Sequence, residues 1–169
     1  MLLTAALAVL SMGCGDDQPN EPEPTQEPTV VGSWDVIFRL EARHPNPELK
    51  RILECNLGLE IPAEIGGAFS GELTTITTLF ERMIPPGEGC GEQGSRFSDV
   101  AGAVTNKTFV RMTVSRNLVS LAGCAEGTAP PELTGAIGAT QMIMMSTFDC
   151  ENEDTVGLGV FIEFAAGRI

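Results

Sequence analysis

The sequence lacks most of the residues that enzyme and metal sites require. It has one histidine, His44, which lies between Arg43 and Pro45 with no identifiable partner, and it contains no Cys-x-x-Cys pair and no Gly-x-Ser-x-Gly segment. One histidine does not complete a common zinc site with these cysteines, and the usual hydrolase nucleophile motif is missing. We therefore predict no metal, no cofactor and no catalytic residue, and we interpret His44 as a solvated loop residue.

Basic residues are also scarce. The chain has 10 Lys and Arg against 23 Asp and Glu, which gives a formal net charge of −13. Five of the acids precede residue 30, which leaves −8 for the remainder, and the ten basic residues are scattered. Proteins bind nucleic acid by neutralising its phosphates with clustered Lys and Arg. Nucleic acid is therefore not an expected partner.

The one apolar run near the start is short. Residues 1–10 are almost entirely apolar, but a membrane-spanning helix needs about 20 such residues. The following Ser11-Met12-Gly13-Cys14 resembles the lipobox of bacterial lipoproteins, in which the cysteine is acylated and becomes the first residue. This resemblance implies a signal peptide over residues 1–13 and a lipid on Cys14, and a plain secretory signal is the alternative.

The segment after Cys14 is predicted to be an extended tether over residues 14–29. Residues 15–28 hold four prolines and five acids and no large apolar side chain, so they cannot bury enough surface to fold. The globular domain is expected over residues 30–169. The protein is then expected in the cell envelope, anchored to the membrane through its lipid and facing the periplasm or the cell exterior.

Four cysteines remain after Cys14, namely Cys55, Cys90, Cys124 and Cys150. An even number of cysteines in an exported chain predicts two disulfides, formed in an oxidising compartment. Four cysteines allow three different pairings, and their spacing does not select one.

The composition from Val30 onward predicts an all-β domain. Short runs rich in Val, Ile, Thr and Phe are separated by Gly, Asn and Pro, and no long segment has helical periodicity. Turn residues at Gly66-Gly67, Asn106-Lys107 and Gly138 predict sequential hairpins. One short helix is expected over residues 47–52, with Asn46 as its N-cap and Pro47 at its first position. The predicted strands cover residues 33–42, 53–61, 68–80, 96–103, 108–115, 132–137, 140–148 and 156–164.

Eight such strands form either a closed barrel or a sandwich, and a family resemblance favours the barrel. Gly32-Ser33-Trp34 resembles the Gly-x-Trp signature of lipocalins and related calycin barrels. Residues 100–104 and 133–137 look like two copies of a hairpin element found in lipocalin-like bacterial lipoproteins, and residues 159–164 with Arg168 are similar to the last strand of that group. The resemblance spans residues 31–168.

This resemblance implies an eight-stranded antiparallel up-and-down barrel with at most one short helix. Trp34 and Arg168 are then expected to close one end of the barrel, with the guanidinium stacked on the indole. In that topology the cysteines pair most simply as Cys55 with Cys90 and Cys124 with Cys150, and two other pairings remain possible.

Several further residues are candidates for chemistry. Met142 and Met144 share one strand face and are a candidate apolar ligand lining, although ordinary core packing is the favoured explanation. Glu60, Glu64 and Glu72 lie around the second hairpin as candidate acid and base groups. The acidic knot between the last two strands is a candidate calcium site or a solvated hairpin tip, and consists of Asp149, Glu151, Glu153 and Asp154.

Residues 89–94 match the dinucleotide-binding Gly-x-Gly-x-x-Gly pattern, but the required strand before and helix after are not expected there. We interpret this segment as a disulfide-stapled loop. Two functions remain for the domain. The first is a barrel whose open end binds a small apolar molecule, and the second is a structural or protein-interaction domain whose barrel is filled by its own side chains.

Overall fold

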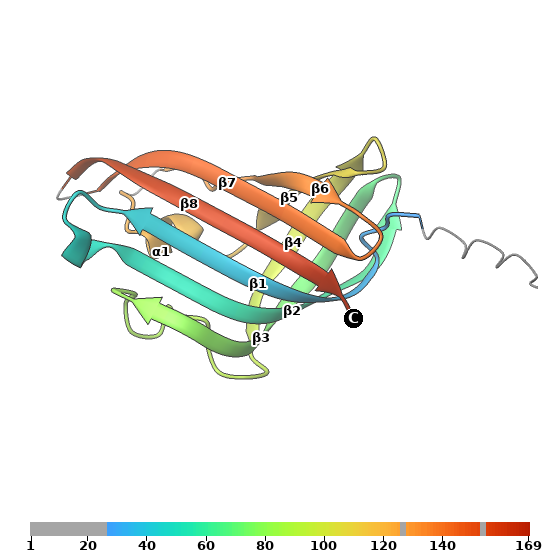
Figure 1. Cartoon of the computed structure of the whole chain (residues 1–169), viewed down its shortest axis with the longest axis horizontal. Helices are drawn as coiled ribbons and strands as arrows, with labels where there is room; N and C mark the ends of the chain where they lie inside the picture. Colours follow the sequence, from blue (N-terminus) through green and yellow to red (C-terminus); the bar gives the residue numbers. More distant parts are fainter. Residues whose placement is uncertain (1–26, 126–127, 153–154) are drawn as a thin grey trace, which may run out of the picture.

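A computed structural model describes residues 27–125, 128–152 and 155–169 of the chain and contains a closed antiparallel barrel (Figure 1). Each strand pairs with the next along the chain, and the last strand pairs with the first. The predicted fold class is confirmed. The eight strands are β1 (Gly32–Arg43), β2 (Arg51–Ile65), β3 (Ala68–Arg82), β4 (Arg96–Thr105), β5 (Phe109–Val114), β6 (Leu133–Ile137), β7 (Gln141–Asn152) and β8 (Thr155–Arg168).

The predicted signal peptide, Cys14 and most of the tether lie outside the described residues. Within the described ranges, no helix is long and apolar enough to span a bilayer. The described chain enters the barrel at the end where the C-terminus also lies (Figure 1).

The strands alternate between buried and exposed side chains, as a two-residue period requires. In β1, Trp34, Val36 and Phe38 are fully buried, whereas Asp35 and Ile37 between them are exposed. The inward-facing side chains of all eight strands contribute to one hydrophobic core. The core therefore occupies the barrel interior.

The predicted turns join the strands as expected. Gly66 and Gly67 connect β2 to β3 with φ angles of 61° and 87°, and Asn106 and Lys107 connect β4 to β5 with φ angles of 51° and 63°. Both residues of each turn thus adopt the left-handed conformation that two-residue hairpins demand. Gly138 follows β6 directly. These three hairpins are confirmed.

The helices differ from the prediction. The expected helix over residues 47–52 is shorter, a 3-10 helix at Pro47–Leu49, because Arg51 already pairs with Ala42 in the β1–β2 ladder. A second helix, α1 (Leu118–Ala122), was not predicted. Asn117 caps α1 by accepting a hydrogen bond from the Ser120 amide at 3.0 Å. The capped segment is only five residues long, so it shows no helical periodicity in the sequence.

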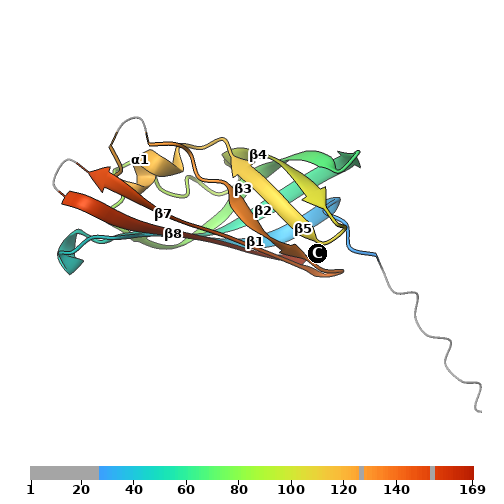
Figure 2. The ribbon, with the colours of Figure 1, turned by 90° about the horizontal axis from the view of Figure 1, so that it is seen from above.

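The barrel is flattened, and two glycines permit the close approach of its strands. Figure 2 shows β7, β8 and β1 in one layer with β4 and β5 crossing above it. Gly102 lies opposite Phe69, and an added Cβ would meet the Phe69 ring and the Arg111 carbonyl. At Gly135 an added Cβ would meet the Ile143 carbonyl. These glycines are the central residues of the two repeated hairpin elements, so close packing explains the repeat.

Two disulfides fasten connecting segments to the barrel wall. Cys55 on β2 is bonded to Cys90 in the β3–β4 loop, and Cys124 after α1 is bonded to Cys150 on β7. The pairing implied by the family resemblance is the one that forms. Disulfides persist in oxidising compartments, so the two bonds indicate a non-reducing, extracytoplasmic environment.

Candidate functional site

One groove on the outer surface crosses β1, β2, β3 and β4 and has a volume of about 710 Å³, and it is called the larger groove below. Four of its lining residues are direct cross-strand neighbours, because Ser33 pairs with Glu60, Glu60 with Glu72, and Glu72 with Asp99. All four are exposed and alternate with buried residues on their strands, so they form one row across the outside of the barrel. We call this set the acidic row.

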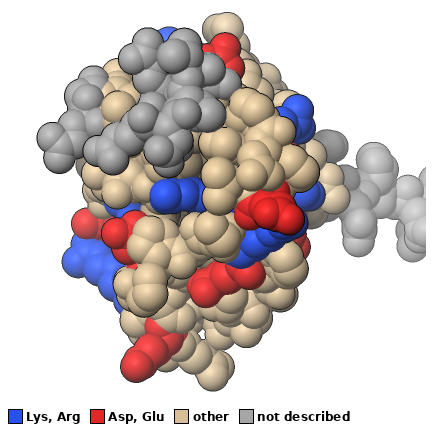
Figure 3. Space-filling model, turned by 90° about the vertical axis from the view of Figure 1, so that its left-hand side faces the viewer, with Lys and Arg blue, Asp and Glu red and all other residues tan. Residues whose placement is uncertain are grey.

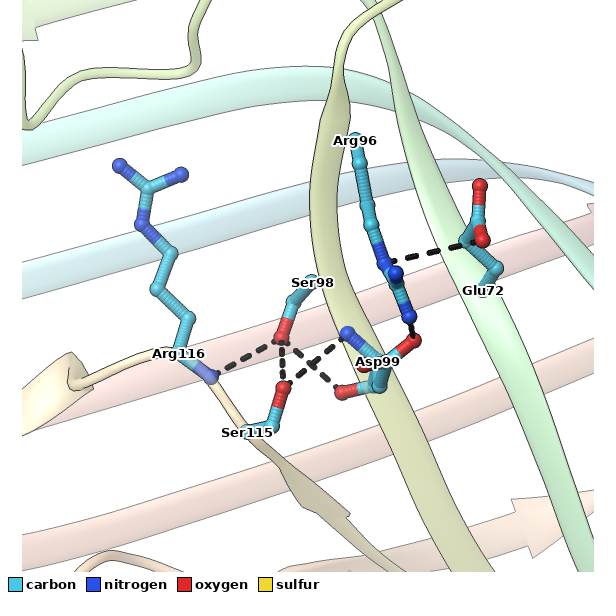
Figure 4. Close-up of polar contacts among 6 residues, drawn as sticks. All are labelled: Glu72, Arg96, Ser98, Asp99, Ser115 and Arg116. Carbon is cyan, nitrogen blue, oxygen red and sulfur yellow. Dashed lines mark hydrogen bonds and ion pairs between the residues drawn. The ribbon is translucent and has the colours of Figure 1, made fainter.

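Like charges directly opposite one another on a sheet destabilise it. The acidic row nevertheless places Glu72 between Glu60 and Asp99, with only partial compensation. Arg96 contacts Glu72 and Asp99, with its Nε 3.6 Å from the Glu72 carboxylate and its Nη2 paired with Asp99 (Figure 4). Ser33 donates a hydrogen bond to Glu60. Three carboxylates and one guanidinium leave a net negative wall.

Asp99 is held in place by the neighbouring strand end. Its amide donates to Ser115 Oγ at 3.1 Å, and its carbonyl accepts from Ser98 Oγ at 2.9 Å. Figure 4 shows that the two serine hydroxyls also contact each other, at 3.1 Å, and that the Arg116 amide donates to Ser98. These hydrogen bonds therefore fix the backbone of Asp99 at this part of the groove.

The rest of the groove is largely apolar. Pro62, Val100 and the C-terminal Ile169 contribute apolar surface, and Gly58 and Gly71 add bare backbone. A smaller groove of about 320 Å³ lies across β1, β7 and β8 beside Arg43, Asp149 and Phe161. The larger groove combines an apolar floor with an acidic wall, so it suits an apolar group that carries a positive charge.

The candidate ligand-lining methionines lie elsewhere. Met142 and Met144 are fully buried in the hydrophobic core, where Met142 is paired with Ile137 and Met144 with Gly135. Neither residue lines the two outer grooves. The structure therefore places both methionines among the side chains that fill the barrel.

Trp34 and Arg168 meet at the end of the barrel where the chain enters. The Arg168 guanidinium lies 4.7 Å from the centre of the Trp34 ring, and the two residues are partners in the β1–β8 ladder. Arg168 Nη2 also donates to the carbonyls of Thr29 and Val31, at 2.6 and 3.0 Å. Trp34 Nε1 donates to the Val30 carbonyl at 2.8 Å. These bonds fasten residues 29–31 across the barrel end.

Glu41 is a buried carboxylate surrounded by three cations at the opposite end. Lys50 Nζ lies 2.8 Å from it, and Arg39 and Arg43 lie 3.0 and 3.1 Å away. The hydrogen bond from Lys50, together with those from the arginines, holds the pKa of Glu41 below its ordinary value despite burial. Figure 3 shows basic and acidic side chains intermixed on this end of the molecule.

Arg116 fastens the β3–β4 loop. Its Nη2 donates to the carbonyls of Glu88 and Gly89, both at 2.6 Å, and its guanidinium lies 4.4 Å from the Phe97 ring centre. Burial lowers the pKa of Arg116. Both contacts hold the loop against the barrel end.

The remaining sequence candidates are placed as follows. His44 Nδ1 accepts a hydrogen bond from the Asn46 amide at 3.0 Å and so stabilises the β1–β2 connection. Glu60 and Glu72 are brought together in the acidic row, but Glu64 pairs with Phe69, farther along the hairpin. The Gly-x-Gly-x-x-Gly segment is a disulfide-bonded loop followed by β4 instead of a helix.

The predicted acidic knot is only partly described. Glu153 and Asp154 lie outside the described residues. Among the described residues, no group of three or more His, Cys, Asp or Glu side chains is placed to hold a metal ion. The calcium site stays a prediction.

Sequence reasoning identified Glu60 and Glu72 but missed Asp99, Arg96 and the groove itself. The signal that was available is the alternation of each strand, which marks these residues as outward-facing. Their alignment into one row depends on the register between strands, and the bulges in the β2–β3 ladder shift that register.

Comparison with known proteins adds no relative to this description. No protein-family model matches the chain, and no curated protein matches it. The residues and their geometry are therefore the basis for assigning a function.

Proposed function

We propose that this chain is an exported lipoprotein, anchored through Cys14, whose lipocalin-like barrel acts through its outer surface as an interaction domain of the cell envelope. In this proposal the barrel interior is structural and holds no ligand. The two disulfides support an extracytoplasmic location. The acidic tether then separates the membrane from the domain.

The observation that carries the proposal is the burial of many large side chains inside the barrel. Small-molecule sites are concave and typically enclose about 300–1,000 Å³, whereas large side chains occupy the core of this barrel. Its fully buried members include Trp34, Phe38, Leu57, Met112, Met142 and Phe164. Burial of both candidate methionines supports the filled barrel over a ligand held at the open end.

The outer groove is the best-formed site for such an interaction. Its acidic row keeps like charges opposed at a cost in stability, which is expected where residues serve binding instead of folding. The absence of an enzymatic activity and of a nucleic-acid partner stays a prediction. The negative groove wall is consistent with a partner that presents a positive charge.

Lipid anchoring is tested by metabolic labelling with a radioactive or clickable fatty acid. The proposal expects label in the wild-type protein and none in the Cys14→Ser variant, which should also leave the membrane fraction. Label that persists in the variant, or an unlabelled wild type, contradicts the anchor.

Action through the groove is tested by photo-crosslinking in the cells that make the protein. A photoreactive residue replaces Ser70 in the groove, and the matched control replaces Thr113, an exposed position on the outer face of β5. The proposal expects a discrete crosslinked partner from position 70 and none from position 113. Equal crosslinking at both positions, or none at position 70, contradicts a groove-specific interaction.

A further inference from the structure

We propose that the free edge of β3 binds an extended segment of a partner protein, which adds to the sheet as an extra strand. The edge comprises residues 76–82 and is separate from the acidic row. This inference rests on the proposed function, because it names the chemistry of a partner for the same outward-acting domain.

The edge exists because β3 is longer than the strand beside it. β4 pairs with β3 only from Ala68 to Thr74. The next residue, Thr75, bonds to the loop, with its amide 2.8 Å from the Ser95 carbonyl and its carbonyl 2.7 Å from the Gly94 amide. Residues 76–82 pair with β2 on one side. On the other side they have no backbone hydrogen bond to any described residue, and Figure 1 shows β3 running along the lower margin of the barrel.

The loop that follows β3 is bonded to the inward-facing side of the strand. Cys90 is disulfide-bonded to Cys55, a buried inward-facing residue, and its amide donates to the Glu81 carboxylate at 3.0 Å. Thr75 Oγ1 donates to the Cys90 carbonyl. These three bonds fix Cys90, in the middle of the loop, on the inner side of the strand. Residues 76–82 are all exposed, so the unpaired backbone groups of the edge remain open to a partner.

The side chains of the edge are those that favour strand pairing. Ile76, Leu79 and Phe80 are 38%, 46% and 48% exposed, and the segment 76–80 carries no charge and no proline. Protected edge strands ordinarily carry Lys or Pro to prevent pairing with another chain. An uncharged edge with open backbone groups is the binding surface of β-strand addition, in which main-chain hydrogen bonds supply affinity.

Two bulges make the edge selective. In the β2–β3 ladder, Thr75 and Thr77 pair with consecutive residues of β2, as do Thr78 and Phe80, so Ile76 and Leu79 are the extra residues. A bulge bends the strand and increases its twist. Bulges oppose the regular pairing of one edge with an identical edge. We infer that the occupant is a flexible extended segment that adapts to the bend.

Charge identifies the occupant. Three carboxylates and one guanidinium lie in or beside the edge, which leaves a net negative charge. Glu54 pairs with Phe80, Glu81 and Arg82 end the segment, and Glu92 lies in the adjoining loop. The Arg82 guanidinium donates to the Pro47 carbonyl at 3.0 Å. A second copy of this chain brings the same carboxylates and a net charge of −13, so like charges oppose self-association. The charge favours a different protein, whose extended segment alternates apolar or β-branched residues and carries Lys or Arg.

The test selects peptides from a random display library against the purified full-length protein. We expect peptides with alternating apolar residues and at least one basic residue, binding with a Kd below about 100 µM. Their addition should shift the backbone amide signals of residues 76–82. Leu79→Lys, which places a charge on the edge, should weaken binding by about tenfold or more. Ile143→Lys is the matched control, since Ile143 is 48% exposed on β7, and it should leave binding unchanged.

Three results overturn the inference: no peptide recovered, peptides that shift amides elsewhere, or binding that Leu79→Lys leaves intact. A concentration-dependent dimer that Leu79→Lys abolishes assigns the edge to a second copy instead. If Leu79→Lys fails to fold, the amide shifts of the wild-type protein on addition of peptide still test whether the edge is the binding surface. Discovery of a small molecule inside the barrel contradicts the proposed filled interior but leaves the amide shifts at the edge unaffected.

Discussion

The guanidinium of Arg168 lies 4.7 Å from the centre of the Trp34 ring and joins the last strand to the first at the end of the barrel where the chain enters. The same guanidinium donates to the carbonyls of Thr29 and Val31, so it fastens the start of the domain as well. A planar guanidinium both stacks on an aromatic ring and donates several hydrogen bonds, which a lysine ammonium does not do. One side chain thus links the first strand to the last and fastens the backbone of residues 29 and 31.

Replacement of Arg168 should destabilise the barrel. We expect Arg168→Ala to lower the free energy of unfolding by about 2 kcal/mol, because a cation–π contact and charged hydrogen bonds are lost. Arg168→Lys should recover only part of this loss. The free energy of unfolding of the wild type and of both variants is measured by urea denaturation, monitored through the fluorescence of Trp34, the single tryptophan. Equal stability of the three would mean that the contact has no role in closure.

The close-approach glycines should tolerate no side chain. Gly135→Ala should cost about 2 kcal/mol, because the new methyl group meets the Ile143 carbonyl and the backbone must shift. Gly138→Ala is the control, since its Cβ would lie 3.8 Å from the Gln141 carbonyl, and it should change stability by less than about 0.5 kcal/mol. The same denaturation assay measures both. A neutral Gly135→Ala would show that the strands are not closely packed there.

Stability should depend on pH through Glu41. The hydrogen bond from Lys50 lowers the pKa of Glu41 in the folded state, so its stabilisation is present above the ordinary carboxyl pKa and is lost as the pH falls through the folded value. We expect Glu41→Gln to lose about 2 kcal/mol at neutral pH, and its difference from the wild type to shrink as the pH falls from the ordinary carboxyl pKa through the lower folded value. Glu48→Gln, at an exposed carboxylate, is the control. A difference that is constant from pH 7 to pH 3 contradicts this origin.

The two disulfides should contribute similarly to stability. They close loops with sequence separations of 35 and 26 residues. By the chain-entropy model each contributes about 3–4 kcal/mol. The contribution of each bridge to the free energy of unfolding is measured by denaturation of a double variant. The first carries Cys55→Ser with Cys90→Ser, and the second carries Cys124→Ser with Cys150→Ser. Loss of the Cys55–Cys90 bridge alone should also increase hydrogen exchange in residues 83–95. Equal exchange in the two double variants would contradict the role of this bridge in holding that loop.

The sequence was sufficient for the strand number and several turns because both depend on local patterns. Short runs rich in Val, Ile, Thr and Phe identified all eight strands, and Gly66-Gly67 and Asn106-Lys107 marked turns that need left-handed backbone. α1 was missed because five residues between Asn117 and Gly123 are too few for periodicity. The ends of β2 were underestimated, as at Arg51, because pairing with a distant partner extends the strand through polar residues.

The candidate site was harder to predict because it is built from register. Glu60, Glu72 and Asp99 come from three strands, and their alignment depends on which residues pair across each ladder. A shift of one residue would turn an outward carboxylate inward. The free edge of β3 could likewise not be predicted from the sequence, since it results from the different lengths of β3 and β4.

The filled barrel is the central claim, and native mass spectrometry tests it most directly. The full mature protein is released with mild detergent from the membrane of the cells that make it and is measured without refolding. We predict a mass equal to the polypeptide with two disulfides and the lipid on Cys14, and nothing more. A stoichiometric additional small molecule, retained by the folded protein and released on unfolding, would contradict the filled interior and make the barrel a carrier of that ligand.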